Sequence, residues 1–208
     1  MNIDHINEIA YKKMGNLKAH IRREKGFIYY HGLRTAKLAL TLRKNIYPEI
    51  SKYDDIIYVG ALFHDIGKGI EPHEKTGQAL VKYMLKKHCT EEELGMISDI
   101  VRFHRDRNTD KDYSIWVKLV QDADILEHQG TTEVWLNFAY SLYDERSYDR
   151  AIEWWLKDEK SLKERIEQEG KLNYSFSRKI WHEKISFVDN FIKRLKDESE
   201  GEIYINKF

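Results

Sequence analysis

The chain has 208 residues, and its 35 Lys and Arg side chains balance 35 Asp and Glu side chains, so its formal net charge is zero. Duplex nucleic acid usually requires a basic excess in the protein that binds it, and we therefore expect no such partner. Apolar residues make up 41% of the chain and charged residues 34%, which is typical of a folded globular protein and not of a disordered one.

Membrane and secretion signals are missing from the sequence. No stretch approaches the roughly eighteen apolar residues that a membrane-spanning helix needs. The segment 1–10 carries Asp4 and Glu8 and lacks the apolar core of a signal peptide. The single cysteine, Cys89, excludes an internal disulfide framework and is typical of a reducing compartment. We therefore expect a cytoplasmic protein without a membrane partner.

Apolar residues recur with a helical period in the first two thirds of the chain, and no alternating strand pattern is present. Pro72 favours a helix start, and Thr90 with Glu93 predicts a capping box at another. A polar loop is expected over 105–113. The predicted helices cover about 2–23, 29–44, 54–66, 72–88, 90–104 and 114–128.

Residues 131–197 predict two or three longer amphipathic helices, interrupted near Gly170. A short tail, 198–208, follows them. No internal repeat, linker or low-complexity segment is present. We therefore predict an all-α protein with one domain over 1–208, in which a motif core at about 20–130 precedes the C-terminal helices.

Several predicted helices place one ionisable side chain on an apolar face. The helix 54–66 is apolar almost all round and ends in His64 and Asp65. His31, His104 and Asp124 each continue the apolar stripe of another helix. Any one of them has an ordinary explanation as a hydrogen-bonded core residue or a cap. Inward-facing His and Asp side chains on four helices are explained more simply by a shared cation.

Two imidazoles and two carboxylates form a mixed nitrogen and oxygen ligand set. Such a set suits one divalent ion of Mn, Fe, Co, Ni or Zn, whereas Mg prefers oxygen ligands but stays among the candidates. Four protein ligands on an octahedral ion leave two positions for water or substrate. Because a bound ion lowers the pKa of its water and neutralises phosphate charge, the pattern predicts metal-assisted hydrolysis.

The order of these residues resembles a known family. His31, the run HDIGK at 64–68 and the run VQDAD at 120–124 are similar to the H…HD…D signature of the HD-domain metal-dependent phosphohydrolases. The runs HGLRTAKLAL and KLVQDADILEHQG resemble segments of the small bacterial members. The similarity covers about 20–195. It implies a helical bundle, the HD-domain fold, around one buried divalent metal.

The resemblance implies His31, His64, Asp65 and Asp124 as metal ligands. Asp122 is the alternative to Asp124, which we favour because the apolar pair and acidic residue after it fit the family pattern. Asp122 would then orient a ligand histidine.

The resemblance also suggests catalytic residues. Asp65 or a neighbouring carboxylate would assist deprotonation of water, and Lys68 or His104 would offset charge on a phosphate. Lys68 can equally be a solvated lysine, and His104 a structural histidine. His73 and His104 are the candidates for a second metal, although we expect His73 to be solvated. Arg34 can reach a bound anion or simply be a surface charge.

The activity implied is hydrolysis of a phosphoester or phosphoanhydride bond in a nucleotide, tested most directly with Mn²⁺. The substrate would be a nucleoside or deoxynucleoside triphosphate, cleaved to monophosphate and pyrophosphate, or a monophosphate that loses its phosphate. Alternatives are a dinuclear phosphodiesterase or dinucleotide polyphosphate hydrolase, a di-iron oxygenase, and a non-catalytic nucleotide-binding regulatory domain. A homodimer is compatible with the sequence, although no segment identifies an interface.

Overall fold

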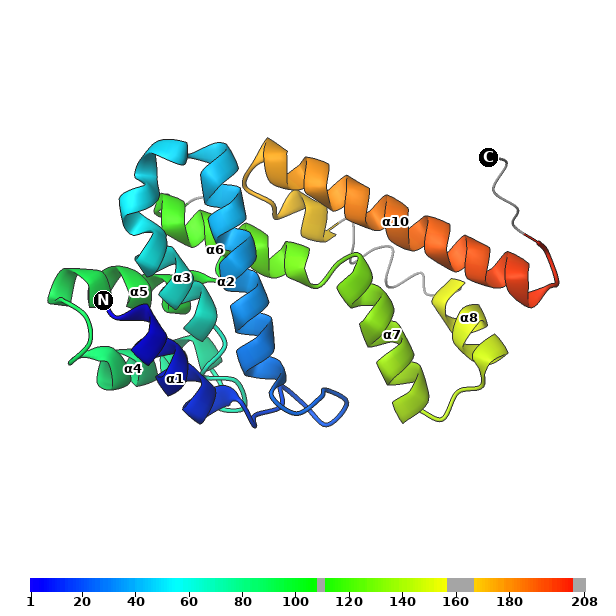
Figure 1. Cartoon of the computed structure of the whole chain (residues 1–208), viewed down its shortest axis with the longest axis horizontal. Coiled ribbons are helices and arrows are strands. Elements are labelled where there is room, and N and C mark those ends of the chain that lie inside the picture. The colour runs from blue at the N-terminus through cyan, green and yellow to red at the C-terminus, as the bar shows by residue number, and fades with distance from the viewer. Residues whose placement is uncertain (108–110, 157–166, 204–208) are drawn as a thin grey trace. The chain divides into compact units, whose positions relative to one another are not determined.

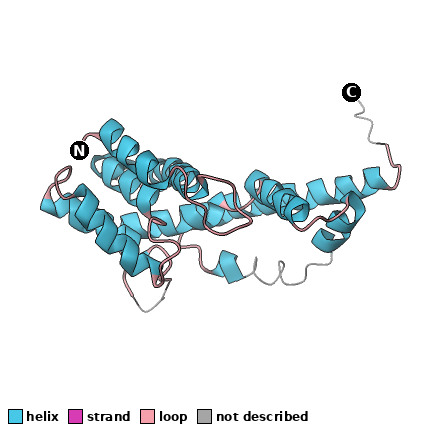
Figure 2. Ribbon diagram, turned by 90° about the horizontal axis from the view of Figure 1, so that it is seen from below, coloured by secondary structure: helices cyan, strands magenta, loops and turns pink. Residues whose placement is uncertain are grey.

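The computed structural model describes residues 1–107, 111–156 and 167–203, and these residues form helices, turns and loops without any β-strand (Figure 2). The predicted all-α fold class is confirmed. No helix in these ranges is both long and apolar enough to cross a bilayer. The end of the predicted tail, 204–208, and part of the predicted loop, 108–110, lie outside the described residues, as do residues 157–166.

The chain divides into two compact units. The first contains Met1–Glu127 and Lys171–Ser177, and the second contains His128–Gly170 and Arg178–Phe208, apart from the residues that are not described. Every residue of the predicted metal site belongs to the first unit. The expectation of one domain over 1–208 stays a prediction.

The first unit contains seven of the labelled helical elements in the described residues (Figure 1). They are α1 (Ile3–Met14), α2 (Phe27–Ile46), the 3-10 helix η1 (Pro48–Tyr53), α3 (Asp54–Phe63), α4 (His73–Leu85), α5 (Glu91–Phe103) and α6 (Ile115–Glu127).

Two predicted helices end earlier in the structure than in the sequence prediction. The first was expected to reach about residue 23, but α1 ends at Met14, where the Gly15 N–H donates to the Tyr11 carbonyl. The third was expected to reach about residue 66, but α3 ends at Phe63. The chain then forms a succession of tight turns over 64–70. Glycine is a poor helix former, which explains the end of α1 at Gly15. The Thr90 capping box is confirmed at the start of α5.

Helix α3 forms the centre of the first unit. From Ile56 to Phe63 every residue except Tyr58 is buried, and Ile57, Val59 and Phe63 are fully inaccessible to solvent. The helix packs against α1, α2, α5 and α6. Burial of each large apolar side chain contributes about 1.5–3 kcal/mol relative to exposure. The helix is thereby fixed in place, and so is the His64-Asp65 pair that follows it directly.

Two glycines allow the backbone approaches that assemble the site. A Cβ atom on Gly32 in α2 would lie 2.3 Å from the Leu62 carbonyl oxygen of α3. A Cβ atom on Gly67 would lie 2.0 Å from the carbonyl oxygen of His73 at the start of α4. Side chains are therefore excluded at both positions. The first contact brings α2 close to the end of α3, and the second brings α4 against the turn after it.

The second unit contains α7 (Thr131–Tyr143), α8 (Tyr148–Leu156) and α10 (Ser175–Ser199) from Arg178 onward. Aromatic rings join these helices: Phe138 lies edge-on to Trp155 at 5.8 Å and to Phe191 at 6.1 Å between ring centroids. Such edge-to-face pairs add to the stabilisation from apolar burial. In its described residues the region has the amphipathic helices that the sequence predicts.

Candidate metal centre

Four predicted ligands converge in the first unit, and we call them the first ligand group: His31, His64, Asp65 and Asp124. His31 Nε2 lies 3.1 Å from His64 Nε2, 3.2 Å from Asp124 Oδ1 and 3.9 Å from Asp65 Oδ2. His64 Nε2 lies 3.6 Å from the same two carboxylate oxygens. The side chains of the two histidines are fully buried, Asp65 is 3% exposed and Asp124 is 16% exposed.

Hydrogen bonds at the far side of each imidazole fix its orientation. His31 Nδ1 lies 2.6 Å from the Glu127 carboxylate, and His64 Nδ1 lies 2.7 Å from the Ala61 carbonyl oxygen. Oxygens of this kind only accept, so both Nδ1 atoms carry the proton. The Nε2 atoms therefore point at each other and at the carboxylate oxygens, as in the carboxylate–histidine–metal arrangement of known metal sites.

This donor set fits a divalent cation. Two imidazole nitrogens and two carboxylates face one another in a buried site, and the carboxylates require positive charge between them, from a proton or from a metal ion. Ligands about 2.0–2.2 Å from a single ion lie roughly 3–4 Å from one another, and the distances within the first ligand group have this spacing. Mixed imidazole and carboxylate donors suit Mn, Fe, Co, Ni or Zn.

The pKa values show how much positive charge the group attracts. Burial lowers the pKa of His31, but its hydrogen bonds with Asp124 and Glu127 outweigh burial and raise that pKa to about 9. Burial likewise raises the pKa of Asp124, yet hydrogen bonds with His31 and His64 hold it well below its usual value. Both shifts favour charged groups, so the carboxylates are ionised and available to a cation.

A second ligand group shares Asp65 with the first and adds His73 and His104. Asp65 Oδ1 lies 3.5 Å from His104 Nε2 and 3.7 Å from His73 Nε2. Both Nε2 atoms are buried and have no hydrogen-bond partner among the described residues. His104 Nδ1 bonds the Val101 carbonyl oxygen at 2.8 Å, so its Nε2 lone pair faces Asp65. Buried polar atoms without partners are uncommon, and a cation would satisfy these.

The expectation that His73 is solvated is wrong. Its side chain is 1% exposed. The reason is the turn at Gly67, which packs directly on the backbone of His73 and turns the start of α4 inward. His73 Nδ1 lies 3.2 Å from Glu71 Oε1 and 3.4 Å from Arg105 Nη1.

Lys68 and His104, the predicted catalytic residues, both contact Asp65. Lys68 Nζ lies 2.6 Å from Asp65 Oδ2, and the lysine side chain is 29% exposed. Burial raises the pKa of Asp65, but His64, His104 and Lys68 hold it well below its usual value. Burial lowers the pKa of His104, which favours the neutral imidazole. The structure places the two side chains beside the ligands, and their catalytic roles stay predictions.

The sequence analysis expected Asp122 to orient a ligand histidine. In the described residues Asp122 instead bonds the segment that precedes α10. Its carboxylate accepts hydrogen bonds from the Asn173 backbone N–H and side-chain amide, each at 2.8 Å, and from the Tyr174 N–H at 3.2 Å. Residues two apart on a helix point about 200° apart, so Asp122 and Asp124 serve opposite sides of α6. Asp122 anchors the segment 171–177, while Asp124 reaches His31 and His64.

Sequence reasoning missed the roles of Glu127 and Arg107 and left that of Arg34 open. Glu127 is buried and bonds both His31 and the Arg34 guanidinium. Arg107 Nη2 lies 3.5 Å from Asp124 Oδ2. Helical spacing could have located two of them. Glu127 follows Asp124 by three positions and Arg34 follows His31 by three, so each shares a helix face with a predicted ligand. Arg107 lies in a loop, where no periodicity locates it.

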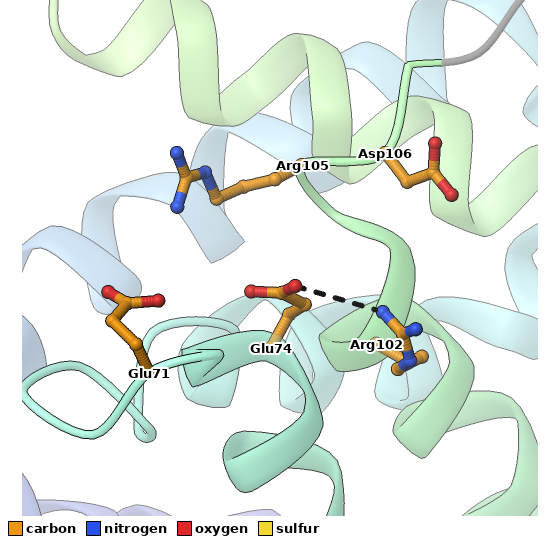
Figure 3. A pocket seen from close by; sticks show the side chains of 5 residues that line it. All are labelled: Glu71, Glu74, Arg102, Arg105 and Asp106. Atoms are coloured by element: carbon orange, nitrogen blue, oxygen red, sulfur yellow. Dashed lines mark ion pairs between the residues drawn. The ribbon is translucent and has the colours of Figure 1, made fainter.

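A pocket of about 420 Å³ is lined by residues around the start of α4 and the end of α5 (Figure 3). Its walls mix charges of both signs, and Figure 3 shows Arg105 on the opposite side of the pocket from Glu71 and Glu74. Arg102 Nη1 lies 4.0 Å from Glu74 Oε1. The five side chains that line the pocket are Glu71, Glu74, Arg102, Arg105 and Asp106.

Comparison with known proteins identifies a family model that matches part of the chain. Residues 28–128 match the family model described as the HD domain. This segment is an HD domain. It contains both ligand groups and ends one residue after Glu127. The resemblance predicted from the order of His31, the HD pair and Asp124 is therefore confirmed.

Solved structures share the fold. A Bacillus thuringiensis HD-superfamily hydrolase has 21% identity and a TM-score of 0.67, over 96% of this chain and 97% of that one. A Listeria innocua protein has 23% identity and a TM-score of 0.58, over 98% and 100%. Bacillus subtilis YpgQ in complex with ADP has 16% identity and a TM-score of 0.60, over 94% and 96%. No curated protein sequence matches the chain.

Proposed function

We propose that this chain is a metal-dependent phosphohydrolase that cleaves a phosphoester or phosphoanhydride bond of a nucleotide. The observation that carries the proposal is the convergence of His31, His64, Asp65 and Asp124 at ligand spacing within an HD domain. A divalent ion held there binds a phosphoryl oxygen and lowers the pKa of a water molecule.

The protein's own residues have separate tasks in this proposal. The imidazoles of His31 and His64 hold the ion through Nε2, with Glu127 and the Ala61 carbonyl fixing their orientation. Asp65 and Asp124 supply negative charge, and Asp65 is the proton acceptor of the proposed reaction. Lys68, 2.6 Å from Asp65 and partly exposed, is the cation that offsets phosphate charge. Because its Nδ1 proton is already donated to Val101, His104 offers a lone pair at Nε2 and not a positive charge.

We propose a nucleotide as the substrate class. The fold is shared with YpgQ, whose structure is a complex with ADP. We favour a nucleoside or deoxynucleoside triphosphate that is cleaved to monophosphate and pyrophosphate. Release of phosphate from a monophosphate is the alternative, and it differs in the substrate and in the bond that water cleaves, a phosphoester bond in place of a phosphoanhydride bond.

A dinuclear phosphodiesterase or dinucleotide polyphosphate hydrolase is the second candidate function. The observation in its favour is the second ligand group, where two buried Nε2 atoms face Asp65 Oδ1. Asp65 belongs to both ligand groups and would supply negative charge to an ion in either. Metal analysis after saturation and desalting separates the two candidates, since a mononuclear enzyme retains one ion per chain and a dinuclear one retains two. In a dinuclear protein, His73→Ala should reduce two ions to one.

The proposed function is tested by turnover of a nucleotide and deoxynucleotide panel with Mn²⁺, with products separated by chromatography. The wild type should release pyrophosphate or phosphate, and His64→Ala with Asp65→Ala should abolish release. His182→Ala is the matched control, because this histidine is 65% exposed and lies in the second unit. Tight Mn²⁺ binding without turnover of any phosphoester would contradict the proposed enzymatic activity. It would favour the alternative, a non-catalytic nucleotide-binding regulatory domain.

A further inference from the structure

Arg107 is a cation at the edge of the first ligand group that no sequence motif explains. It follows α5, and its Nη2 donates to the Gln121 carbonyl oxygen at 3.0 Å and approaches Asp124 Oδ2 at 3.5 Å. Its side chain is only 15% exposed. The guanidinium is therefore largely removed from water while it lies against the outer oxygen of a proposed metal ligand.

The guanidinium keeps donors that the described residues leave unused. Nε is buried and makes no hydrogen bond. An arginine has five N–H donors in a rigid fork, and leaving a buried donor unpaired is unfavourable. Arg34, the other arginine beside this group, differs in that its Nε is already bonded to Glu127. Arg107 therefore has capacity for an additional acceptor at a largely buried position, whereas the Arg34 side chain is 44% exposed.

The position of Arg107 coincides with the accessible edge of the first ligand group. Asp124 is 16% exposed, whereas His31, His64 and Asp65 are between 0 and 3% exposed. A ligand that touches this group from solvent therefore meets Asp124 first. Arg107 contacts the oxygen of Asp124 that does not face the histidines. An anion bound at this edge would come within reach of the unused donors.

We propose that Arg107 binds a phosphoryl group of the substrate at the metal centre, an inference that rests on the proposed function. Guanidinium groups pair with phosphate through two parallel hydrogen bonds, which a point charge such as lysine cannot reproduce. Together with Lys68 on the opposite carboxylate, Arg107 gives the centre two cations that face substrate oxygens. Arg107 is thus a residue for affinity and phosphate position, and the histidines remain the ligands of the ion.

Pyrophosphate binding to the Mn²⁺-loaded protein, followed by calorimetry, tests this inference. Arg107→Gln should weaken pyrophosphate binding roughly 10- to 100-fold, the range for loss of a charge-assisted hydrogen bond. Arg107→Lys should recover only part of the affinity. Arg102→Gln is the matched control, because Arg102 pairs with Glu74 in the pocket of Figure 3. This variant should bind pyrophosphate like the wild type. Circular dichroism establishes that each variant is folded.

Metal affinity, measured in the same variants, separates the inference from a purely structural role. If Arg107→Gln weakens Mn²⁺ binding and leaves the pyrophosphate affinity of the loaded protein unchanged, Arg107 only positions Asp124 and the inference is overturned. Equal pyrophosphate affinity in all variants also overturns it. If the wild type hydrolyses no phosphoester while Arg107→Gln loses pyrophosphate binding, the proposed function fails and the anion site stands.

Discussion

At the residue scale, Glu127 determines the orientation of His31. Its carboxylate bonds His31 Nδ1 at 2.6 Å and is itself held by Arg34. Partners of this kind raise the basicity of a metal-binding imidazole and keep its lone pair aimed at the ion. Although it is not a ligand in our proposal, Glu127 therefore contributes to metal binding.

We expect Glu127→Gln to weaken Mn²⁺ binding by about 10- to 100-fold, the usual effect of losing such a partner. Titration of the metal-free protein by calorimetry measures the affinity. Glu93→Gln is a suitable control, because Glu93 caps the start of α5 and touches no ligand. Wild-type affinity in Glu127→Gln would show that packing alone, including the Phe27 ring stacked on His31, orients the imidazole.

The charge on His31 gives the metal-free protein a defined pH dependence. Burial lowers the pKa of His31, but hydrogen bonds with Asp124 and Glu127 raise it from 6.5 to about 9. Because the folded state binds this proton more tightly, its stabilisation is complete below the unfolded pKa and is lost as the pH rises through the folded pKa. The free energy of unfolding in urea should therefore fall between pH 6.5 and about 9.

This pH dependence should be smaller in His31→Gln, which has no proton to lose, and an equally steep fall in that variant would contradict the assignment to His31. Metal binding should show the opposite trend. Protons compete with the ion for His31 Nε2, so Mn²⁺ affinity should rise with pH over the same interval.

At the element scale, the α2–α3 contact depends on a missing side chain. A Cβ on Gly32 would lie 2.3 Å from the Leu62 carbonyl oxygen, which is backbone and cannot turn aside. Gly32→Ala should therefore destabilise the protein by about 1–3 kcal/mol, as overpacking does, and weaken Mn²⁺ binding by separating His31 from His64.

Urea unfolding, with and without Mn²⁺, checks the effect of Gly32→Ala. Gly95→Ala is the matched control, because Gly95 lies within α5 and a Cβ there would meet nothing within 4 Å. Alanine is the better helix former, so Gly95→Ala should stabilise the protein by about 0.5–1 kcal/mol. Similar free-energy changes in the two variants would exclude the proposed backbone approach as the cause.

Helix α6 presents two aspartates with different tasks. Asp122→Ala should destabilise the protein by about 1–3 kcal/mol, because the Asn173 and Tyr174 N–H groups lose their acceptor, and should leave Mn²⁺ affinity close to that of the wild type. Asp124→Ala should abolish tight Mn²⁺ binding. Unfolding and metal titration of both variants separate the two effects. Loss of metal in Asp122→Ala at unchanged stability would reverse the assignment.

At the scale of the whole molecule, the metal should act on one unit. All candidate ligands lie in the first unit, within 28–128. Mn²⁺ at about 100 times its dissociation constant should stabilise the folded state by about 2.7 kcal/mol, and chelation should reverse this. Amide hydrogen exchange should slow in α2, α3 and α6 and stay the same in α7 and α8. Equal protection of α7 and α8 would contradict a local effect.

The all-α fold class could be predicted from the sequence, and the convergence of His31, His64 and Asp124 was expected from it. Helical periodicity is local, so it located the helices, and the apolar faces with His31, His64 and Asp124 indicated which side chains point inward. The order of the motif indicated the HD domain. The helix ends at Gly15 and after Phe63 were predicted less well, because apolar residues can keep a helical spacing where the backbone has already turned.

Which inward-facing groups contact one another could not be predicted without the packing of the helices. His73 was expected in solvent, yet the packing of Gly67 against its backbone brings it to Asp65. Asp122 and Asp124 both face partly apolar surfaces, and only the path of residues 171–177 shows that Asp122 holds backbone N–H groups. Arg107 comes from a loop without periodicity. Contacts between residues far apart in sequence depend on how the helices pack, and a local pattern carries no information about that packing.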